Sequence, residues 1–200
     1  MATPPSQLSF FPDEWPDGLT YLENYISEGE AGRLVQAIDA TPWRTDLKRR
    51  VQHYGYRYDY KARQARREDF LGPLPELLHQ LAERLTADDY FRAVPDQVIV
   101  NEYQPGQGIS AHIDCQPCFG ETIASLSLLS ACVMRFASQT FSQQMELHLQ
   151  PASLLVLNSD ARHMWTHAIP SRKTDLIDGQ KHIRSRRISL TFRTMKFKNS

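Results

Sequence analysis

The chain of 200 residues is 41% hydrophobic and 23% charged with a formal net charge of zero, which is typical of an ordinary globular protein. Its apolar runs, such as residues 154–157, are far too short to cross a bilayer, so we expect no membrane segment. The first ten residues lack the basic start and apolar stretch of a signal peptide, and three cysteines are an odd number, so we expect a cytoplasmic protein in a reducing compartment.

The balanced total conceals an uneven distribution of charge. Residues 1–40 carry seven acidic side chains against one basic, whereas residues 48–67 carry eight basic against one acidic. Residues 181–198 form a second basic segment without any acidic residue. Basic segments of this kind commonly contact phosphate, although an ordinary solvated loop is the alternative interpretation.

Residues 1–47 predict an irregular arm followed by a helix. Four prolines and two acidic turns in residues 1–20 favour an arm that packs Phe10, Phe11 and Trp15 against the rest of the protein. Ser27 and Glu30 have the spacing of a capping box, in which each residue satisfies a backbone group of the other. The apolar periodicity that follows predicts a helix over residues 28–39.

Residues 48–70 combine basic side chains with tyrosines. Tyr54, Tyr56, Tyr58 and Tyr60 occur at every second position, so in an extended segment the four rings would share one face. An aromatic face framed by basic residues suits stacking on bases and contacts with phosphates. The alternative is a strand that packs its tyrosines against the core.

The remainder of the chain predicts one more helix and then strands. Leucines at three- and four-residue steps predict a helix that begins at Pro73 and ends near Thr86. From Gln97 the period changes to two, and we predict strands over residues 97–103, 122–128, 132–136, 145–149, 153–157, 164–169 and 186–192. Short strands after two helices indicate a mainly β protein with N-terminal helices, namely a single domain with an antiparallel sandwich or jelly roll over residues 97–195.

A candidate metal site centres on His112 and Asp114. Two residues apart on an extended segment, their side chains point to the same face and could bind one metal ion. Two histidines and one carboxylate are the ligands of non-haem Fe(II) oxygenases, and they leave coordination positions open for a cosubstrate and dioxygen. A third ligand would come from a later segment, and its candidates are His148, His163, His167 and His182.

Four motifs in one order resemble the AlkB family of Fe(II)/2-oxoglutarate-dependent dioxygenases. They are Asn101-x-Tyr103-x-Pro105-Gly106, His112-x-Asp114, Trp165-x-His167 and the segment from Arg187 to Arg193. The resemblance implies a double-stranded β-helix (jelly roll) that uses Fe(II), 2-oxoglutarate and O2. It also implies that His112, Asp114 and His167 are the iron ligands.

The same resemblance assigns the cosubstrate site. Arg187 would pair with the distal carboxylate of 2-oxoglutarate, for which a planar guanidinium is suited. Asn101, Tyr103 and Arg193 would hold the rest of the molecule. The family usually has an asparagine at the position of Ser189, so one amide contact would be lost or replaced by a hydroxyl.

The resemblance also implies that residues 48–70 form a lid over a flipped base, and the predicted substrate-binding residues are Arg50, Tyr54, Tyr56, Tyr58 and Gln116. A known repair enzyme has an acidic residue at the position of Gln116, so the usual preference for 1-methyladenine is not expected here. Cys115 and Cys118 have zinc spacing, but one such pair is weak, and we interpret them as thiols incidental to the loop. His163 is interpreted as a packed side chain or a partner of a ligand.

The predicted function is oxidation of a base in DNA or RNA, first of all oxidative demethylation. The first alternative is hydroxylation of a modified wobble uridine in tRNA, because the segments around Gly55 and His167 locally resemble the dioxygenase domain of the tRNA wobble-uridine hydroxylases most closely. The others are a catalytically silent RNA-binding module and an oxygenase of small molecules or proteins. No obligate protein partner is expected.

Overall fold

The computed structural model describes residues 15–45, 48–140, 142–177 and 179–197. Its helices are α1 (Glu28–Asp39), α2 (Glu76–Ala87) and α3 (Ser159–His163), with a 3-10 helix at Arg67–Asp69. Its strands are β1 (Leu19–Leu22), β2 (Arg50–Tyr54), β3 (Gln97–Tyr103), β4 (Ile109–His112), β5 (Phe119–Leu129), β6 (Cys132–Ser138), β7 (Gln144–Leu149), β8 (Leu154–Leu157), β9 (Trp165–Ile169), β10 (Thr174–Ile177), β11 (Gln180–Ile183) and β12 (Arg187–Met195).

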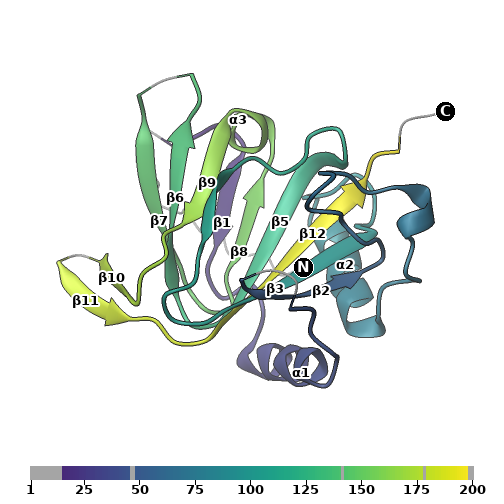
Figure 1. Cartoon of the computed structure of the whole chain (residues 1–200), viewed down its shortest axis with the longest axis horizontal. Helices are drawn as coiled ribbons and strands as arrows, with labels where there is room; N and C mark the ends of the chain where they lie inside the picture. The colour runs from purple at the N-terminus through teal and green to yellow at the C-terminus, as the bar shows by residue number, and fades with distance from the viewer. Residues whose placement is uncertain (1–14, 46–47, 141, 178, 198–200) are drawn as a thin grey trace, which may run out of the picture.

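Two antiparallel sheets form the body of the protein. The larger has the order β1-β8-β5-β12-β3-β2 and the smaller the order β4-β9-β6-β7, while β10 and β11 form a separate hairpin. Figure 1 shows the two sheets as two layers, with the hairpin projecting at one end. This arrangement confirms the predicted jelly roll of a mainly β protein.

Strand β12 shows how one sequence serves two faces of the large sheet. Ile188, Leu190 and Phe192 are buried in the core that also contains residues of α1 and α2. Successive side chains of a strand point to opposite faces, so the intervening residues face the inside of the jelly roll. Arg187, Ser189 and Arg193 lie on this inner face and are buried although they are polar.

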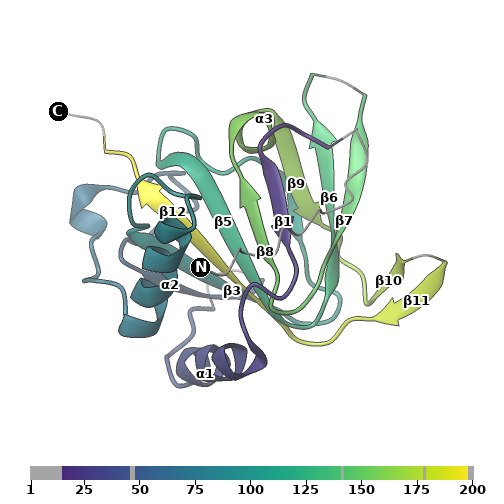
Figure 2. The same cartoon turned by 180° about the vertical axis from the view of Figure 1, so that it is seen from behind.

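The helices cover the outer face of the large sheet. Figure 2 shows α1 and α2 against it, away from the four-stranded sheet. Helix α1 has the predicted bounds, and its capping box is confirmed, because Ser27 Oγ accepts from the Glu30 amide while Glu30 Oε2 accepts from the Ser27 amide. Helix α2 begins at Glu76, later than predicted. Pro75 disfavours a helical conformation at the preceding residue, which delays the start.

The strand predictions are correct in place and differ at the ends. Strand β3 has the predicted bounds, and the other six predicted strands correspond to β5, β6, β7, β8, β9 and β12. The four-residue strands β1, β4, β10 and β11 were not predicted.

Of the predicted arm, Trp15 packs against the core between the two sheets, whereas Phe10 and Phe11 lie outside the described residues. None of the helices in the described ranges is long and apolar enough to span a membrane.

Candidate metal centre

Strand pairing brings the three predicted iron ligands together. His112 is the last residue of β4 and is paired in register with His167 on the antiparallel strand β9, so their rings lie 4.4 Å apart. Asp114 follows two residues later, and its Oδ2 lies 3.6 Å from His167 Nε2. One ligand atom from each of the three residues lies within 4.8 Å of the others. The structure therefore selects His167 from the four candidate histidines.

Hydrogen bonding prepares the ligand atoms. His112 Nδ1 lies 2.8 Å from the carbonyl oxygen of Ser110. Because a carbonyl only accepts, Nδ1 carries the proton and Nε2 keeps its lone pair for a metal. Arg193 donates through Nη2 (2.7 Å) and Nε (3.1 Å) to Oδ1 of Asp114. This contact holds the carboxylate with Oδ2 turned toward the histidines.

Burial and charge set the protonation states of the ligands. Burial alone would raise the pKa of Asp114, but the Arg193 guanidinium and the two imidazoles hold it far below its ordinary value. Burial, together with the neighbouring His112, lowers the pKa of His167 to about 4. At neutral pH the site thus presents a carboxylate beside a neutral imidazole, which is the form that binds a metal. The donor set fits Fe(II).

The other candidate histidines are used elsewhere. His163 is the last residue of α3, and its Nε2 lies 2.9 Å from Oε2 of Glu121 on β5. His148 and His182 lie beside each other, with ring centres 6.1 Å apart, and neither belongs to the metal cluster found among the described residues. His163 therefore packs against an acidic partner, in line with its interpretation from the sequence.

The loop after Asp114 differs from expectation, because Cys115 and Cys118 form a disulfide. The amides of Cys118 and Phe119 both donate to the carbonyl of Cys115, so the chain turns back on itself and brings the two Cα atoms within 5.3 Å. This separation suits a disulfide. The interpretation of the pair as two free thiols is therefore wrong for this structure.

Four of the five predicted cosubstrate residues line a cavity of about 860 Å3 that also includes the metal cluster. Asn101 and Tyr103 reach it from β3 and Ser189 from β12. Ser189 Oγ lies 2.9 Å from Ser125 Oγ, so a hydroxyl pair occupies the place where the family usually has an asparagine. Arg193 also lines the cavity, with its guanidinium on Asp114.

Arg187 is buried behind Tyr103, whose ring centre lies 5.6 Å from the guanidinium carbon. Its Nη2 donates to Ser127 Oγ, whereas Nε and Nη1 are buried without a hydrogen-bond partner among the described residues. A buried guanidinium with unused donors is costly unless an anion satisfies it. The unpaired donors fit a carboxylate such as that of 2-oxoglutarate, although Arg187 itself is not among the described residues that line the cavity.

The lid segment supplies the outer wall of the cavity with residues that differ from those predicted. The lining residues from this segment are Lys48, Arg49, Tyr58, Tyr60 and Arg63. Of the predicted substrate-binding residues, Tyr58 alone is among them. Asp114 is the one acidic side chain in the described lining, so cations dominate the cavity.

The four tyrosines do not share one face, because the segment is not extended throughout, which was the condition for that arrangement. Strand β2 ends at Tyr54, and Gly55 adopts a positive φ of 75° that ends the alternation. Tyr54 therefore packs on the core beside the helices, while Tyr56 stacks on Phe70. Tyr58 and Tyr60 instead meet edge to face, with ring centres 5.1 Å apart.

Two further predicted substrate residues also lie away from the cavity. Arg50 binds Glu102 and lies over the ring of Trp43. Gln116 donates to the backbone carbonyl of His163 and is exposed. Gly55, within the run of tyrosines, was the sequence signal that could have corrected the prediction of which side chains line the cavity. A glycine in a strand pattern often marks a bend.

Comparisons with known proteins agree with this site. Residues 18–193 match the model of the 2OG-Fe(II) oxygenase superfamily. The chain is 36% identical over 203 residues to an Arabidopsis thaliana protein named alkylated DNA repair protein ALKBH8 homolog, with 90% of this chain and 58% of that protein covered. It is also 36% identical over 177 residues to mouse tRNA (carboxymethyluridine(34)-5-O)-methyltransferase ALKBH8, with 84% of this chain and 26% of that protein covered.

A solved structure shares the fold. OsALKBH1 superposes with a TM-score of 0.66 at 18% identity, over 88% of this chain and 96% of that one. The family match over most of the chain, the relatives named above and the His112–Asp114–His167 cluster agree with one another. The chain belongs to the 2OG-Fe(II) oxygenase superfamily and, within it, to the AlkB family of dioxygenases, which use Fe(II), 2-oxoglutarate and O2.

Proposed function

We propose that this dioxygenase oxidises a base of a nucleic acid and that residues 48–70 form the lid over that base. The observation that carries the proposal is the lining of the cavity, in which two tyrosine rings and three basic side chains of this segment occur together with the metal cluster. Aromatic rings stack on an extruded base, and basic side chains contact the phosphates beside it. The names of the two ALKBH8 relatives refer to DNA repair and to tRNA, which supports a nucleic-acid substrate.

The chain's own residues would orient this chemistry. His112, Asp114 and His167 would hold the iron, Arg193 would keep the Asp114 carboxylate in place, and Arg187 would take a carboxylate of the cosubstrate. When bound, iron and 2-oxoglutarate would activate O2, so that one oxygen atom is inserted into a C–H bond of the substrate and the other enters succinate as 2-oxoglutarate loses carbon dioxide. An N-methyl group hydroxylated in this way leaves as formaldehyde, which is oxidative demethylation.

The charge of the cavity favours some methylated bases over others as substrates. Bases methylated at adenine N1 or cytosine N3 are cations, and a cavity lined by Lys48, Arg49, Arg63 and Arg193 against Asp114 repels them. Methylated bases that are neutral, such as N6-methyladenine, escape this repulsion. We therefore propose demethylation of a neutral N-methylated base, and the charge of the cavity agrees with the expectation drawn from Gln116.

The second candidate is hydroxylation of a modified wobble uridine. Uracil presents carbonyl oxygens rather than amino groups toward its partners, and basic side chains donate hydrogen bonds to carbonyl oxygens. The basic side chains of the cavity therefore also favour uracil as a substrate, because they can donate hydrogen bonds to its carbonyl oxygens. A silent binding module is disfavoured because the ligand cluster and the unused donors of Arg187 are both present. A cytoplasmic location is also part of the proposal, although the cysteines no longer support it, because Cys115 and Cys118 form a disulfide.

The test is a panel of methylated DNA and RNA oligonucleotides and bulk tRNA, each incubated with Fe(II) and 2-oxoglutarate and read by mass spectrometry. Formaldehyde release identifies demethylation, and a stable gain of one oxygen identifies hydroxylation. N6-methyladenine should react faster than 1-methyladenine in the same sequence. His112→Ala should abolish every product.

A pair of variants tests the lid. Arg63→Gln removes a cation of the cavity wall and should raise the KM for the nucleic acid, most strongly at low salt. Arg135→Gln is the matched control, because Arg135 is an exposed arginine of β6 that pairs with Glu146 outside the cavity. The proposal fails if no nucleic acid binds the protein or stimulates succinate formation.

A further inference from the structure

Two adjacent arginines at the start of the lid have opposite surroundings. Arg50 is the first residue of β2 and points to the outside of the sheet, where Nε (2.5 Å) and Nη2 (2.7 Å) donate to the Glu102 carboxylate. Arg49 lines the cavity instead. Neighbouring residues of an extended segment point to opposite faces, so the strand that carries Arg50 outward carries Arg49 inward.

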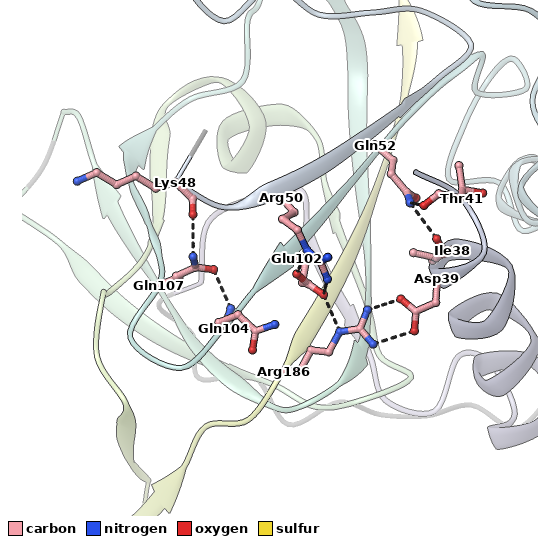
Figure 3. Close-up of polar contacts among 10 residues, drawn as sticks. All are labelled: Ile38, Asp39, Thr41, Lys48, Arg50, Gln52, Glu102, Gln104, Gln107 and Arg186. Carbon is pink, nitrogen blue, oxygen red and sulfur yellow. Dashed lines mark hydrogen bonds and ion pairs between the residues drawn. The ribbon is translucent and has the colours of Figure 1, made fainter. Parts of the chain in front are cut away.

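The backbone around Arg49 is held on both sides. On the residue before Arg49, the side-chain Nε2 of Gln107 donates to the carbonyl oxygen of Lys48 at 2.7 Å (Figure 3). The residue after Arg49 is Arg50, which binds Glu102. Glu102 also binds Arg186, and Arg186 in turn binds Asp39 at the end of α1. These contacts fix Arg49 without using its own side chain.

The side chain of Arg49 meets residues assigned to the cosubstrate. Its Nε donates to Asn101 Oδ1 at 2.8 Å, and its guanidinium carbon lies 5.9 Å from the ring centres of both Tyr60 and Tyr103. Tyr103 therefore has guanidinium groups of Arg49 and Arg187 within 6 Å of its ring. No other hydrogen bond of Arg49 occurs within the described part of the chain, so its terminal amino groups are available to a ligand.

The contact with Asn101 has a directional consequence. Arginine has only donors, so the atom of the Asn101 amide that faces it must be the oxygen. The amide nitrogen of Asn101, with its two donors, is then turned away from Arg49. Without Arg49 the amide could rotate by 180° and present its oxygen to the carboxylates of the cosubstrate, which would repel them.

We propose that Arg49 is a positioning residue for 2-oxoglutarate, which fixes the Asn101 amide with its donors toward the cosubstrate and so couples the seating of the lid to cosubstrate binding. The proposal rests on the assignment of Asn101 to the cosubstrate and is independent of the identity of the nucleic acid. It assigns to the lid a role in the cosubstrate site in addition to that in the substrate site.

The experiment measures cosubstrate binding without turnover. The protein is loaded with Mn(II) in place of Fe(II), and 2-oxoglutarate is titrated by calorimetry in the absence of nucleic acid. Arg49→Met should raise the dissociation constant of 2-oxoglutarate about tenfold, the size expected for one charge-assisted hydrogen bond. Its affinity for Mn(II) should not change. Arg135→Met, on exposed β6, should change neither constant.

A double-mutant cycle separates positioning from simple attraction. If Arg49 acts through the amide, Asn101→Ala should also weaken 2-oxoglutarate binding, and Arg49→Met should add little more in the Asn101→Ala background. Arg49→Lys keeps a donor for the amide oxygen and should lose less than threefold. Arg49→Leu, which also lacks a donor, replaces Arg49→Met if the latter does not fold.

Two results overturn the proposal. One is an unchanged 2-oxoglutarate affinity in the Arg49 variant. The other is full additivity of the two single losses. Neither result touches the proposed action on nucleic acid, which is measured with a different ligand.

Discussion

Glu102 of β3 forms ion pairs with Arg50, the first residue of β2, and with Arg186. Its substitution gives a quantitative test of this network. Its side chain is 2% exposed and accepts three hydrogen bonds, two from Arg50 and one from Arg186 at 2.7 Å. In Glu102→Gln a neutral amide would offer one acceptor atom, and its NH2 group would confront guanidinium donors. At least one charge-assisted hydrogen bond is lost.

The expected cost is about 2 kcal/mol in the free energy of unfolding. Breaking a fully buried ion pair costs about 3–5 kcal/mol. Here the side chains of Arg50 and Arg186 are 44% and 29% exposed, so water replaces part of the lost interaction and the cost is smaller. For a chain of this length, about 2 kcal/mol lowers the Tm by about 4–8 °C.

Thermal unfolding followed by circular dichroism measures this difference. Glu146→Gln is the matched control, because Glu146 pairs with Arg135 at a site where both side chains are about half exposed, and it should shift Tm by no more than about 2 °C. An equal shift in the two variants would refute the reasoning.

The pH dependence supplies a second check. Hydrogen bonding from Arg50 lowers the pKa of Glu102 below its ordinary value of 4.5. A lowered pKa in the folded state means that the stabilisation is complete above about pH 4.5 and is lost as the pH falls further. The difference between wild type and Glu102→Gln should therefore shrink in acid. A difference that stays constant below pH 4 would contradict the ion network.

Three further outcomes are expected. Gly55→Ala should lower the free energy of unfolding by more than about 2 kcal/mol in urea titrations, because φ is +75° and a Cβ would lie 1.8 Å from the carbonyl oxygen of Asp96; a neutral effect would mean that the lid turn is placed wrongly. Glu30→Gln should cost about 1 kcal/mol at pH 7, because it removes the ion pair with Arg84 while a glutamine can keep the capping box; since hydrogen bonding from Arg84 lowers the pKa of Glu30 to about 2, this cost should fade as the pH drops from about 4.5 toward 2. Arg193→Met should weaken Mn(II) binding about 10–100-fold, measured by calorimetry, because the guanidinium orients Asp114; unchanged affinity would show that the carboxylate is held without it.

The parts of the fold that follow from local chemistry could be predicted from the sequence. Helix α1 has its predicted bounds because Ser27 and Glu30 cap it within four residues of sequence. Strand β3 has its predicted bounds because all seven of its residues are buried in a strongly β-branched and aromatic segment. The short strand β4 depends on pairing with β9, far away in the chain, and nothing within its four residues announces it.

The candidate site divides in the same way. The cluster of His112, Asp114 and His167 was predictable from the sequence, because the family resemblance selected His167 among the four candidate histidines. The side chains of the lid that line the cavity could not be predicted in this way. The prediction continued the alternation of strand side chains through Gly55, but the positive φ of this glycine changes which of the following side chains face the cavity. Tyr60, which follows the glycine, therefore lines the cavity, whereas Tyr54 does not. Before the glycine, alternation along the chain turns Arg50 outward, and Arg49 rather than Arg50 lines the cavity.

Arg49 and Arg50 face opposite sides of the large sheet, and this gives a reason for the buried Glu102 between Asn101 and Tyr103 on β3. A shift of β2 by one residue against β3 would exchange the faces of the two arginines, taking the cation out of the cavity. In the observed register Arg50 pairs with Glu102, and the carboxylate lies on the outer face between Asn101 and Tyr103, which face inward. A slip that places Val51 opposite Glu102 would remove the two hydrogen bonds from Arg50 and leave only the one from Arg186, at a cost of about 2 kcal/mol. Glu102 therefore disfavours this slip and supports the register in which Arg49 reaches Asn101.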